Sequence, residues 1–340
     1  MRFGLFFSFQ SPPGVATHEP YRDMLDCLPA AEELGYQSAF FASHHVQSDG
    51  WCPSPLVALA GAAAVTEQMR IGTGVLLVPL YAPLKLAEDV AVLDNLSEGR
   101  LTLGVAPGYV SEEFAAHGVP RDERVPRYEE ALDLMVAAWT QEPASFEGRF
   151  FRLPPSTVQP KPVQKPYPPI WYGVSGPRSL RRAAQRRSVL VASPRHGLAE
   201  LKAHFKTYED AAAEVGFEIT ERPVIREVFV AETKAKAEEL AAPAVTHIFR
   251  ELYGAKSAEG ERVLRSDEGR VVTVKDDVDF EHFKARYIIG DPDFAYREIK
   301  KYETELGATE IICWMHLPGI PARDTMRSVE IFAREVMAAF

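Results

Sequence analysis

Two adjacent histidines, His44 and His45, follow a short apolar run that predicts a buried strand, and a loop with Trp51 comes after them. The carboxyl end of a barrel strand is where such folds place their chemistry, and an imidazole transfers protons near neutral pH. Adjacent residues of an extended segment point to opposite sides, so we expect His44 to work in a pocket and His45 to support the loop. The remaining histidines show no metal-ligand spacing. A purely structural pair is the alternative.

Glycines recur in two predicted strands, at Gly72 and Gly74 and again at Gly104 and Gly108. Neither pattern is a G-x-G-x-x-G turn that opens a helix, so neither indicates a dinucleotide site of the Rossmann type. Glycine within a strand allows another group to approach the backbone closely. That group is either a flat ring or a neighbouring part of a tightly packed barrel, and the spacing by itself favours packing.

A third candidate is the segment from Ser175 to Ser179, SGPRS, at a predicted strand-to-helix junction. Pro177 suits the first helical turn, and Ser175 or Gly176 suits the cap. Free backbone N–H groups there, a hydroxyl and the nearby Arg178 are suited to bind a phosphate. The alternative is an ordinary helix start with a solvated basic face.

The net charge of −10 argues against nucleic acid and anionic membranes as partners, because both favour a basic surface. No apolar run reaches the length that a membrane span needs. The amino-terminal segment predicts a strand and lacks the cleavage site of a signal peptide. Three widely spaced cysteines show no disulfide or zinc pattern, and we expect a cytoplasmic protein.

The chain alternates strands and helices, which predicts an α/β fold with a parallel sheet. Eight strand–helix units favour a (β/α)8 TIM barrel over a doubly wound sheet. The predicted strands cover residues 3–7, 39–41, 70–78, 101–106, 169–173, 189–192, 224–231 and 310–315. The predicted helices cover 21–34, 55–66, 83–96, 177–187, 197–215, 292–306 and 323–340, and another begins at 233.

We expect residues 1–340 to form a single domain with insertions at about 145–169 and 254–291. The first insertion is rich in proline and predicts an extended excursion. The second is polar and charged, and a loop of that length is usually functional or disordered. It is a candidate lid over an active site, with a plain surface insertion as the equal alternative.

Taken together, these motifs resemble the bacterial luciferase-like flavin monooxygenases. The resemblance covers nearly the whole chain, and its most specific part is AEDVAVLDNLSEGR. The other matching segments are RFGLF, SHH, RIGTGVLLVP, PPIWYGVSGPRSLRRAA, IIGDP and LGATEIICW. The resemblance implies a TIM barrel that binds FMN at the carboxyl ends of its strands, and a homodimer formed through the early helices.

Carried over residue by residue, the resemblance places the catalytic histidine at His44. It places the strand that lines the flavin ring at Thr73, Gly74 and Val75, with a cis peptide before Val75. It places the phosphate site at Ser175 and Gly176, with Tyr109 where a backbone amide meets the phosphate. No metal is implied.

Four positions depart from the family pattern: Ser43 and Val174 stand where acids are common, Ala106 where luciferases have a reactive cysteine, and Pro107 where an arginine binds the phosphate. Our hypothesis is that Arg178 supplies the missing positive charge. The departures argue against light emission.

The resemblance implies a two-component monooxygenase. A separate flavin reductase supplies reduced FMN, which reacts with O2 to a flavin C4a-peroxide that oxygenates a small organic substrate, while His44 manages the proton. One alternative uses the deazaflavin F420 in place of FMN. Another is a catalytically silent flavin-binding protein or partner subunit.

Overall fold

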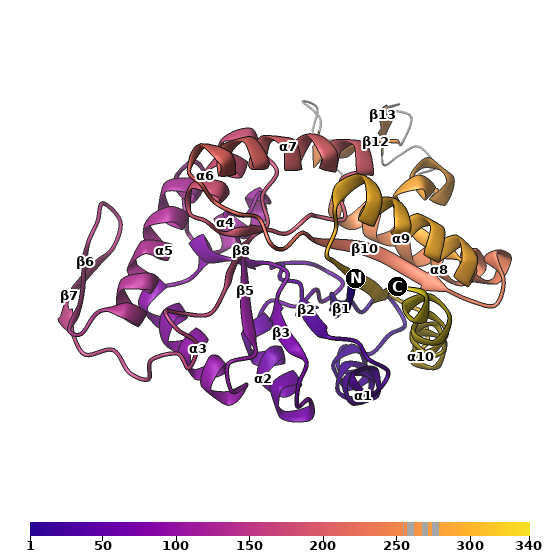
Figure 1. Ribbon diagram of the computed structural model, residues 1–340, viewed down its shortest axis with the longest axis horizontal. Coiled ribbons are helices and arrows are strands. Elements are labelled where there is room, and N and C mark those ends of the chain that lie inside the picture. The colour runs from indigo at the N-terminus through magenta and orange to yellow at the C-terminus, as the bar shows by residue number, and fades with distance from the viewer. Residues whose placement is uncertain (254, 257–261, 267–270, 274–278) are drawn as a thin grey trace.

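The computed structural model describes residues 1–253, 255–256, 262–266, 271–273 and 279–340. A parallel sheet forms its centre (Figure 1). Its main strands are β1 (Arg2–Phe7), β2 (Ser38–Phe41), β3 (Arg70–Thr73), β5 (Leu101–Ala106), β8 (Ile170–Tyr172), β9 (Val189–Leu190), β10 (Pro223–Val230) and β15 (Glu310–His316). Each lies on a segment that the sequence predicts to be a strand. The predicted strand over 70–78 is shorter, because the chain turns after Thr73 and resumes as β4 (Leu76–Leu77).

The strand order is β10–β15–β1–β2–β3–β5–β8–β9. A parallel bridge between Ala192 and Val224 then brings the chain after β9 back against β10. The sheet therefore curls round into the predicted TIM barrel, and the carboxyl ends of its strands meet at one mouth.

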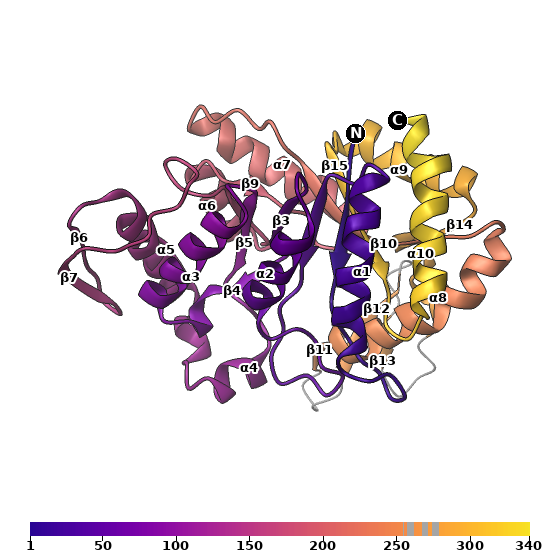
Figure 2. The same ribbon diagram turned by 90° about the horizontal axis from the view of Figure 1, so that it is seen from below.

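Helices cover the outside of the sheet, as Figures 1 and 2 show. They are α1 (Glu19–Glu33), α2 (Pro55–Val65), α3 (Pro83–Leu96), α4 (Ser111–Ala116), α5 (Arg124–Thr140), α6 (Pro177–Gln185), α7 (Leu198–Glu214), α8 (Lys234–Ile248), α9 (Pro292–Leu306) and α10 (Ala322–Ile331). The predicted bounds of α3 and α9 are correct. The helices α4 and α5 were not predicted. Pro126 lies in the first turn of α5, where proline leaves a helix intact.

The first insertion is not merely extended: β6 (Ala144–Glu147) and β7 (Arg152–Ser156) pair as an antiparallel hairpin that projects from the barrel. The second contains β11 (Ala255–Lys256), β12 (Arg262–Arg265) and β13 (Val271–Thr273), and then β14 (Ile288–Gly290), which pairs with β10. Much of the candidate lid lies outside the described residues. No helix in the described part of the chain is long and apolar enough to span a membrane.

Aromatic side chains fill the inside of the barrel. Phe40 stacks on Trp171 with 5.0 Å between ring centroids, and the Arg70 guanidinium lies 4.6 Å from the centroid of the Trp171 ring. Arg70 also pairs with Glu310 and Glu221, so an ionic layer lies below the rings. Because these side chains fill the barrel at the amino-terminal ends of the strands, space for a ligand is left at the carboxyl-terminal ends.

Candidate active site

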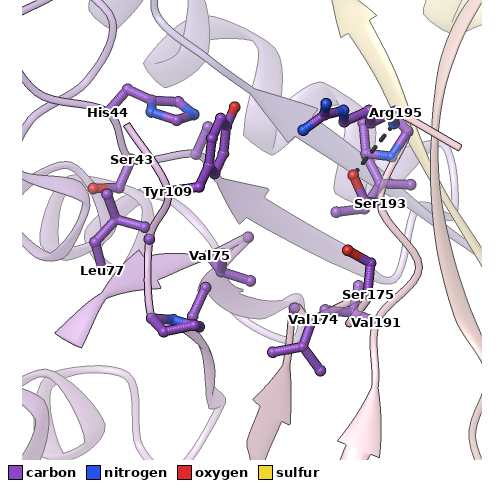
Figure 3. Close-up of a pocket in the computed structure, with 18 of the residues that line it drawn as sticks. Ser43, His44, Val75, Leu77, Tyr109, Val174, Ser175, Val191, Ser193 and Arg195 are labelled. Carbon is purple, nitrogen blue, oxygen red and sulfur yellow. Dashed lines mark hydrogen bonds between the residues drawn. The ribbon is translucent and has the colours of Figure 1, made fainter. Parts of the chain in front are cut away.

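A cavity of about 340 Å³ opens at the carboxyl ends of the strands. Its walls come from the segments that follow β2, β3, β5, β8 and β9, and from β1, β10 and β15 (Figure 3). Six of the predicted site residues line it: His44, Gly74, Val75, Tyr109, Ser175 and Gly176. Thr73 is buried behind the wall, and Arg178 is exposed on the first turn of α6, outside the lining.

His44 is held by a carboxylate. Its Nδ1 lies 2.8 Å from Oε1 of Glu113, a fully buried residue of α4. The same oxygen accepts the backbone N–H of His45 at 2.9 Å, which fixes the loop as well as the ring. When Nδ1 donates its hydrogen to Glu113, Nε2 is the nitrogen that can accept a proton.

The rings around His44 restrict its position. Trp51 meets it edge to face at 4.9 Å between centroids, and Tyr109 does so at 6.0 Å. His45 is buried too, but it lies outside the pocket lining and packs against the rings of Tyr81 and His117. Burial and the nearby His117 lower the pKa of His45, which favours its neutral form.

The wall formed by β3 carries the cis peptide that the resemblance implied, between Gly74 and Val75. Behind it, the Thr73 hydroxyl donates to the Gly104 carbonyl at 2.6 Å. A Cβ on Gly104 would lie 2.0 Å from the Thr73 carbonyl oxygen, and one on Gly173 would lie 2.7 Å from Cγ1 of Val75. Tight packing of neighbouring strands thus explains these glycines, while Gly74 and Gly173 also line the cavity.

The opposite wall is polar. Ser175, Gly176 and Ser179 come from the start of α6, and Ser193 and Arg195 from the segment after β9. The backbone N–H of Arg195 donates to the Ser193 hydroxyl oxygen at 3.2 Å. The Arg195 guanidinium points across the cavity toward Tyr109 and lies 5.7 Å from the centroid of its ring (Figure 3).

Several residues of the site were missed from the sequence. Glu113 lies within a helix that was not predicted, and no motif marked it. Ser193 and Arg195 follow a predicted strand, so the rule that singled out His44 applies to them as well. Arg124, at the start of α5, also lines the pocket. Among the described residues of the lining, Arg124 and Arg195 carry the guanidinium groups. Pro107 and Val174, two of the positions that depart from the family pattern, line the cavity as well.

One further buried acid lies near the pocket. Glu227 follows Ile225 by two residues on β10 and is in register with Trp314 of β15, and both of these neighbours line the cavity. Glu227 is fully buried, and neither carboxylate oxygen has a hydrogen-bond partner within the described residues. Burial raises its pKa to about 7, against the opposing charges of Arg226 and Arg286.

Comparison with known sequences agrees with this geometry. The family model described as luciferase-like monooxygenase matches residues 1–310. The oxygenase component of the flavin-dependent trigonelline monooxygenase of Acinetobacter baylyi is 27% identical over 100% of this chain and 96% of its own. An uncharacterized Sinorhizobium fredii protein, y4vJ, is 32% identical over 60% of this chain, and the match spans 58% of that relative.

Solved structures share the fold. The monooxygenase RslO1 from Streptomyces bottropensis has a TM-score of 0.87 and 26% identity, with 100% of this chain and 99% of that chain covered. The oxygenating constituent of 3,6-diketocamphane monooxygenase of Pseudomonas putida, in complex with FMN, has a TM-score of 0.80 and 22% identity over 99% and 98% of the two chains. An F420-dependent secondary alcohol dehydrogenase has a TM-score of 0.75 and 19% identity over 100% and 99%.

Proposed function

Because this chain belongs to the luciferase-like monooxygenase family, we propose that it is an FMN-dependent oxygenase component. A separate reductase supplies reduced FMN, and the protein uses O2 to oxygenate a small organic substrate. The observation that carries the proposal is the His44–Glu113 pair, which presents an imidazole to a pocket with one glycine-bearing wall and one basic, hydroxyl-bearing wall.

The residues of the pocket fit a phosphorylated flavin. Gly74, Val75 and Gly173 offer a surface without bulky polar groups to a flat ring. The start of α6 brings Ser175, Gly176 and Ser179 to the cavity, and backbone N–H groups at a helix start favour a phosphate. Among the residues that the structure describes, none that lines the cavity carries a negative charge that would repel the phosphate.

Arg124 is the candidate partner of the phosphate. It lies at the start of α5, and the ion pair of Glu129 with Arg182 joins α5 to α6. Arg124 lines the cavity, whereas the exposed Arg178 does not. Arg178 stays a prediction for this role, and we place Arg124 ahead of it because a charge close to the phosphate acts more strongly than one in solvent.

Reduced flavin supplies the activation of O2 when it is bound. The protein's own contribution begins with His44, whose Nε2 can take up or return the proton that the reaction moves, while Glu113 keeps the ring in one orientation. Trp51, Trp314 and Phe6 line the cavity and exclude water from the reacting groups. The trigonelline and diketocamphane oxygenases have organic substrates, and we propose an organic substrate of similar kind here.

The test uses the purified protein, FMNH2 and O2. Anaerobic titration measures the affinity for FMNH2 and, in parallel, for reduced F420. After mixing with O2, we expect oxidised FMN to reappear more slowly than in free solution in the wild type, and His44→Ala to release hydrogen peroxide without this delay. Tight binding of reduced F420 but not of FMNH2 would favour the deazaflavin alternative. Flavin binding with no effect on reoxidation would favour a silent binding protein. The homodimer and the cytoplasmic location stay predictions.

A further inference from the structure

The charge of the pocket is opposite to that of the whole chain. The protein carries a net charge of −10, yet the described residues that line the cavity include Arg124 and Arg195 and neither aspartate nor glutamate. The nearby buried carboxylates, Glu113 and Glu227, lie behind the lining. A partly enclosed pocket with two guanidinium groups and no acid favours anionic ligands.

Arg195 differs from the arginines that stabilise the fold. Arg186 pairs with Glu129 and Asp133, and Arg70 pairs with Glu221 and Glu310. No such ion pair holds the guanidinium of Arg195 in the part of the chain that the structure describes, where its ring contact is with Tyr109. A guanidinium that stacks on an aromatic face keeps its N–H groups available at the edge of its plane.

A hydroxyl group accompanies this guanidinium. The Ser193 oxygen accepts the backbone N–H of Arg195, and its own hydrogen remains to be donated. Figure 3 shows both residues on the wall that faces His44 and Tyr109. A carboxylate in this part of the cavity would receive two parallel N–H donors and one O–H donor, the arrangement in which arginine binds carboxylates most strongly.

The two arginines come from different elements. Arg124 begins α5, whereas Arg195 follows β9 and points toward Tyr109 and His44 (Figure 3). One cofactor phosphate needs one of these positions, and the other remains for a second anion. Both arginines line the same cavity.

We propose that Arg195 and Ser193 bind a carboxylate group of the substrate, while Arg124 serves the phosphate of the cofactor. This inference rests on the proposed function, because it assigns the second anion site to the oxygenation substrate. It makes the substrate class a small organic acid whose apolar part lies against Trp51 and Trp314.

The test compares two preferences in the wild type and in the variants Arg195→Gln, Arg124→Gln and Arg152→Gln, the first on FMN-loaded protein and the second on protein without flavin. The first is the ratio of dissociation constants for benzamide and benzoate, which differ in charge but hardly in shape. The second is the ratio for riboflavin and FMN, which differ in the phosphate. The wild type should prefer benzoate by about tenfold or more, the size expected of a charge-assisted hydrogen-bond pair.

The proposal expects Arg195→Gln to bring the benzoate preference close to one and to leave the FMN preference intact. It expects Arg124→Gln to lower the FMN preference and leave the benzoate preference intact. It expects Arg152→Gln, which removes an exposed charge on the β6–β7 hairpin outside the cavity, to change neither. If Arg195→Gln lowered the FMN preference, with or without the benzoate preference, Arg195 would be the phosphate partner and the proposal would be overturned. A wild type without benzoate preference would also overturn it.

Failure of the proposed function would look different. A wild type that binds no flavin, yet prefers benzoate over benzamide through Arg195, would refute the FMN assignment and retain the anion site. The benzoate titrations are therefore repeated on protein without flavin, with tryptophan fluorescence as the signal, because Trp51 and Trp314 line the cavity.

Discussion

Oε1 of Glu113 accepts both the imidazole Nδ1–H of His44 and the backbone N–H of His45, at 2.8 and 2.9 Å. One buried oxygen therefore sets the ring orientation and the path of the loop together. Because a fully buried carboxylate needs such donors, the pair is also a point of stability.

From this relationship we predict that Glu113→Gln slows the oxygen-dependent step by roughly ten- to a hundredfold, a part of what a positioned acid–base group contributes. The amide oxygen can accept the same two hydrogen bonds, so the affinity for FMNH2 should change little, but the negative charge that favours a protonated imidazole is lost. Rapid mixing of the FMNH2-loaded variant with O2 measures the rate, and its pH profile should shift with it. The adjacent, exposed Glu112→Gln is the control. A wild-type rate and pH profile in Glu113→Gln would show that the negative charge of Glu113 plays no part in this step.

Ser175→Ala should weaken FMN more than riboflavin, by roughly ten- to a hundredfold, because one hydrogen bond to a charged group is lost. Ser175 lines the cavity just before α6, and Ser188, which lies between the end of α6 and β9, is outside the lining and serves as the matched control. Fluorescence titration of both flavins measures the effect. Equal weakening of FMN and riboflavin would indicate that the serine contacts the ring system or only the protein.

The buried Glu227 should make the free energy of unfolding depend on pH. The pKa of its carboxyl group rises from 4.5 in the unfolded chain to about 7 in the folded protein. Below the unfolded pKa the group is neutral in both states, so its burial does not lower the free energy of unfolding. As the pH rises through the interval, the unfolded chain loses the proton first and stability falls, by about 2–3 kcal/mol between roughly pH 5 and pH 8.

The variant Glu227→Gln should lack this loss, so its free energy of unfolding relative to wild type should rise with pH. Urea unfolding at several pH values measures the difference, and the exposed Glu218→Gln provides the comparison. Parallel pH curves for the wild type and Glu227→Gln would contradict the prediction.

Gly104→Ala should destabilise the barrel. The added Cβ would lie 2.0 Å from the Thr73 carbonyl oxygen, and β3 and β5 would have to separate at the wall of the pocket. Overpacking of this kind costs about 1–3 kcal/mol or more. Thermal unfolding should show a clear drop in Tm for Gly104→Ala. At Gly197 a Cβ would meet nothing within 4 Å, so Gly197→Ala should change Tm much less. Similar Tm values for both variants would refute the packing explanation.

The local pattern of the sequence determined most of the barrel. Apolar runs bounded by turn residues predicted all eight main strands, because a strand covered by helices is apolar along its length. Proline at the first turn and serine or glycine after the last turn gave the bounds of α3 and α9. The position of His44 after β2 placed it at the mouth, because every parallel strand ends there.

The partners of these residues depended on contacts between distant segments. Glu113 meets His44 across 69 residues of sequence, and no local pattern records such a pairing. The local sequence also did not show which arginines line the cavity. Arg178 is next to the predicted phosphate site in the chain, but its place on α6 exposes it to solvent. Arg124 and Arg195 line the cavity from other elements. The sequence by itself determined where the pocket would form and which imidazole would face it. Only the tertiary structure decided which charges surround that imidazole, because burial and long-range packing, not chain neighbourhood, bring them together.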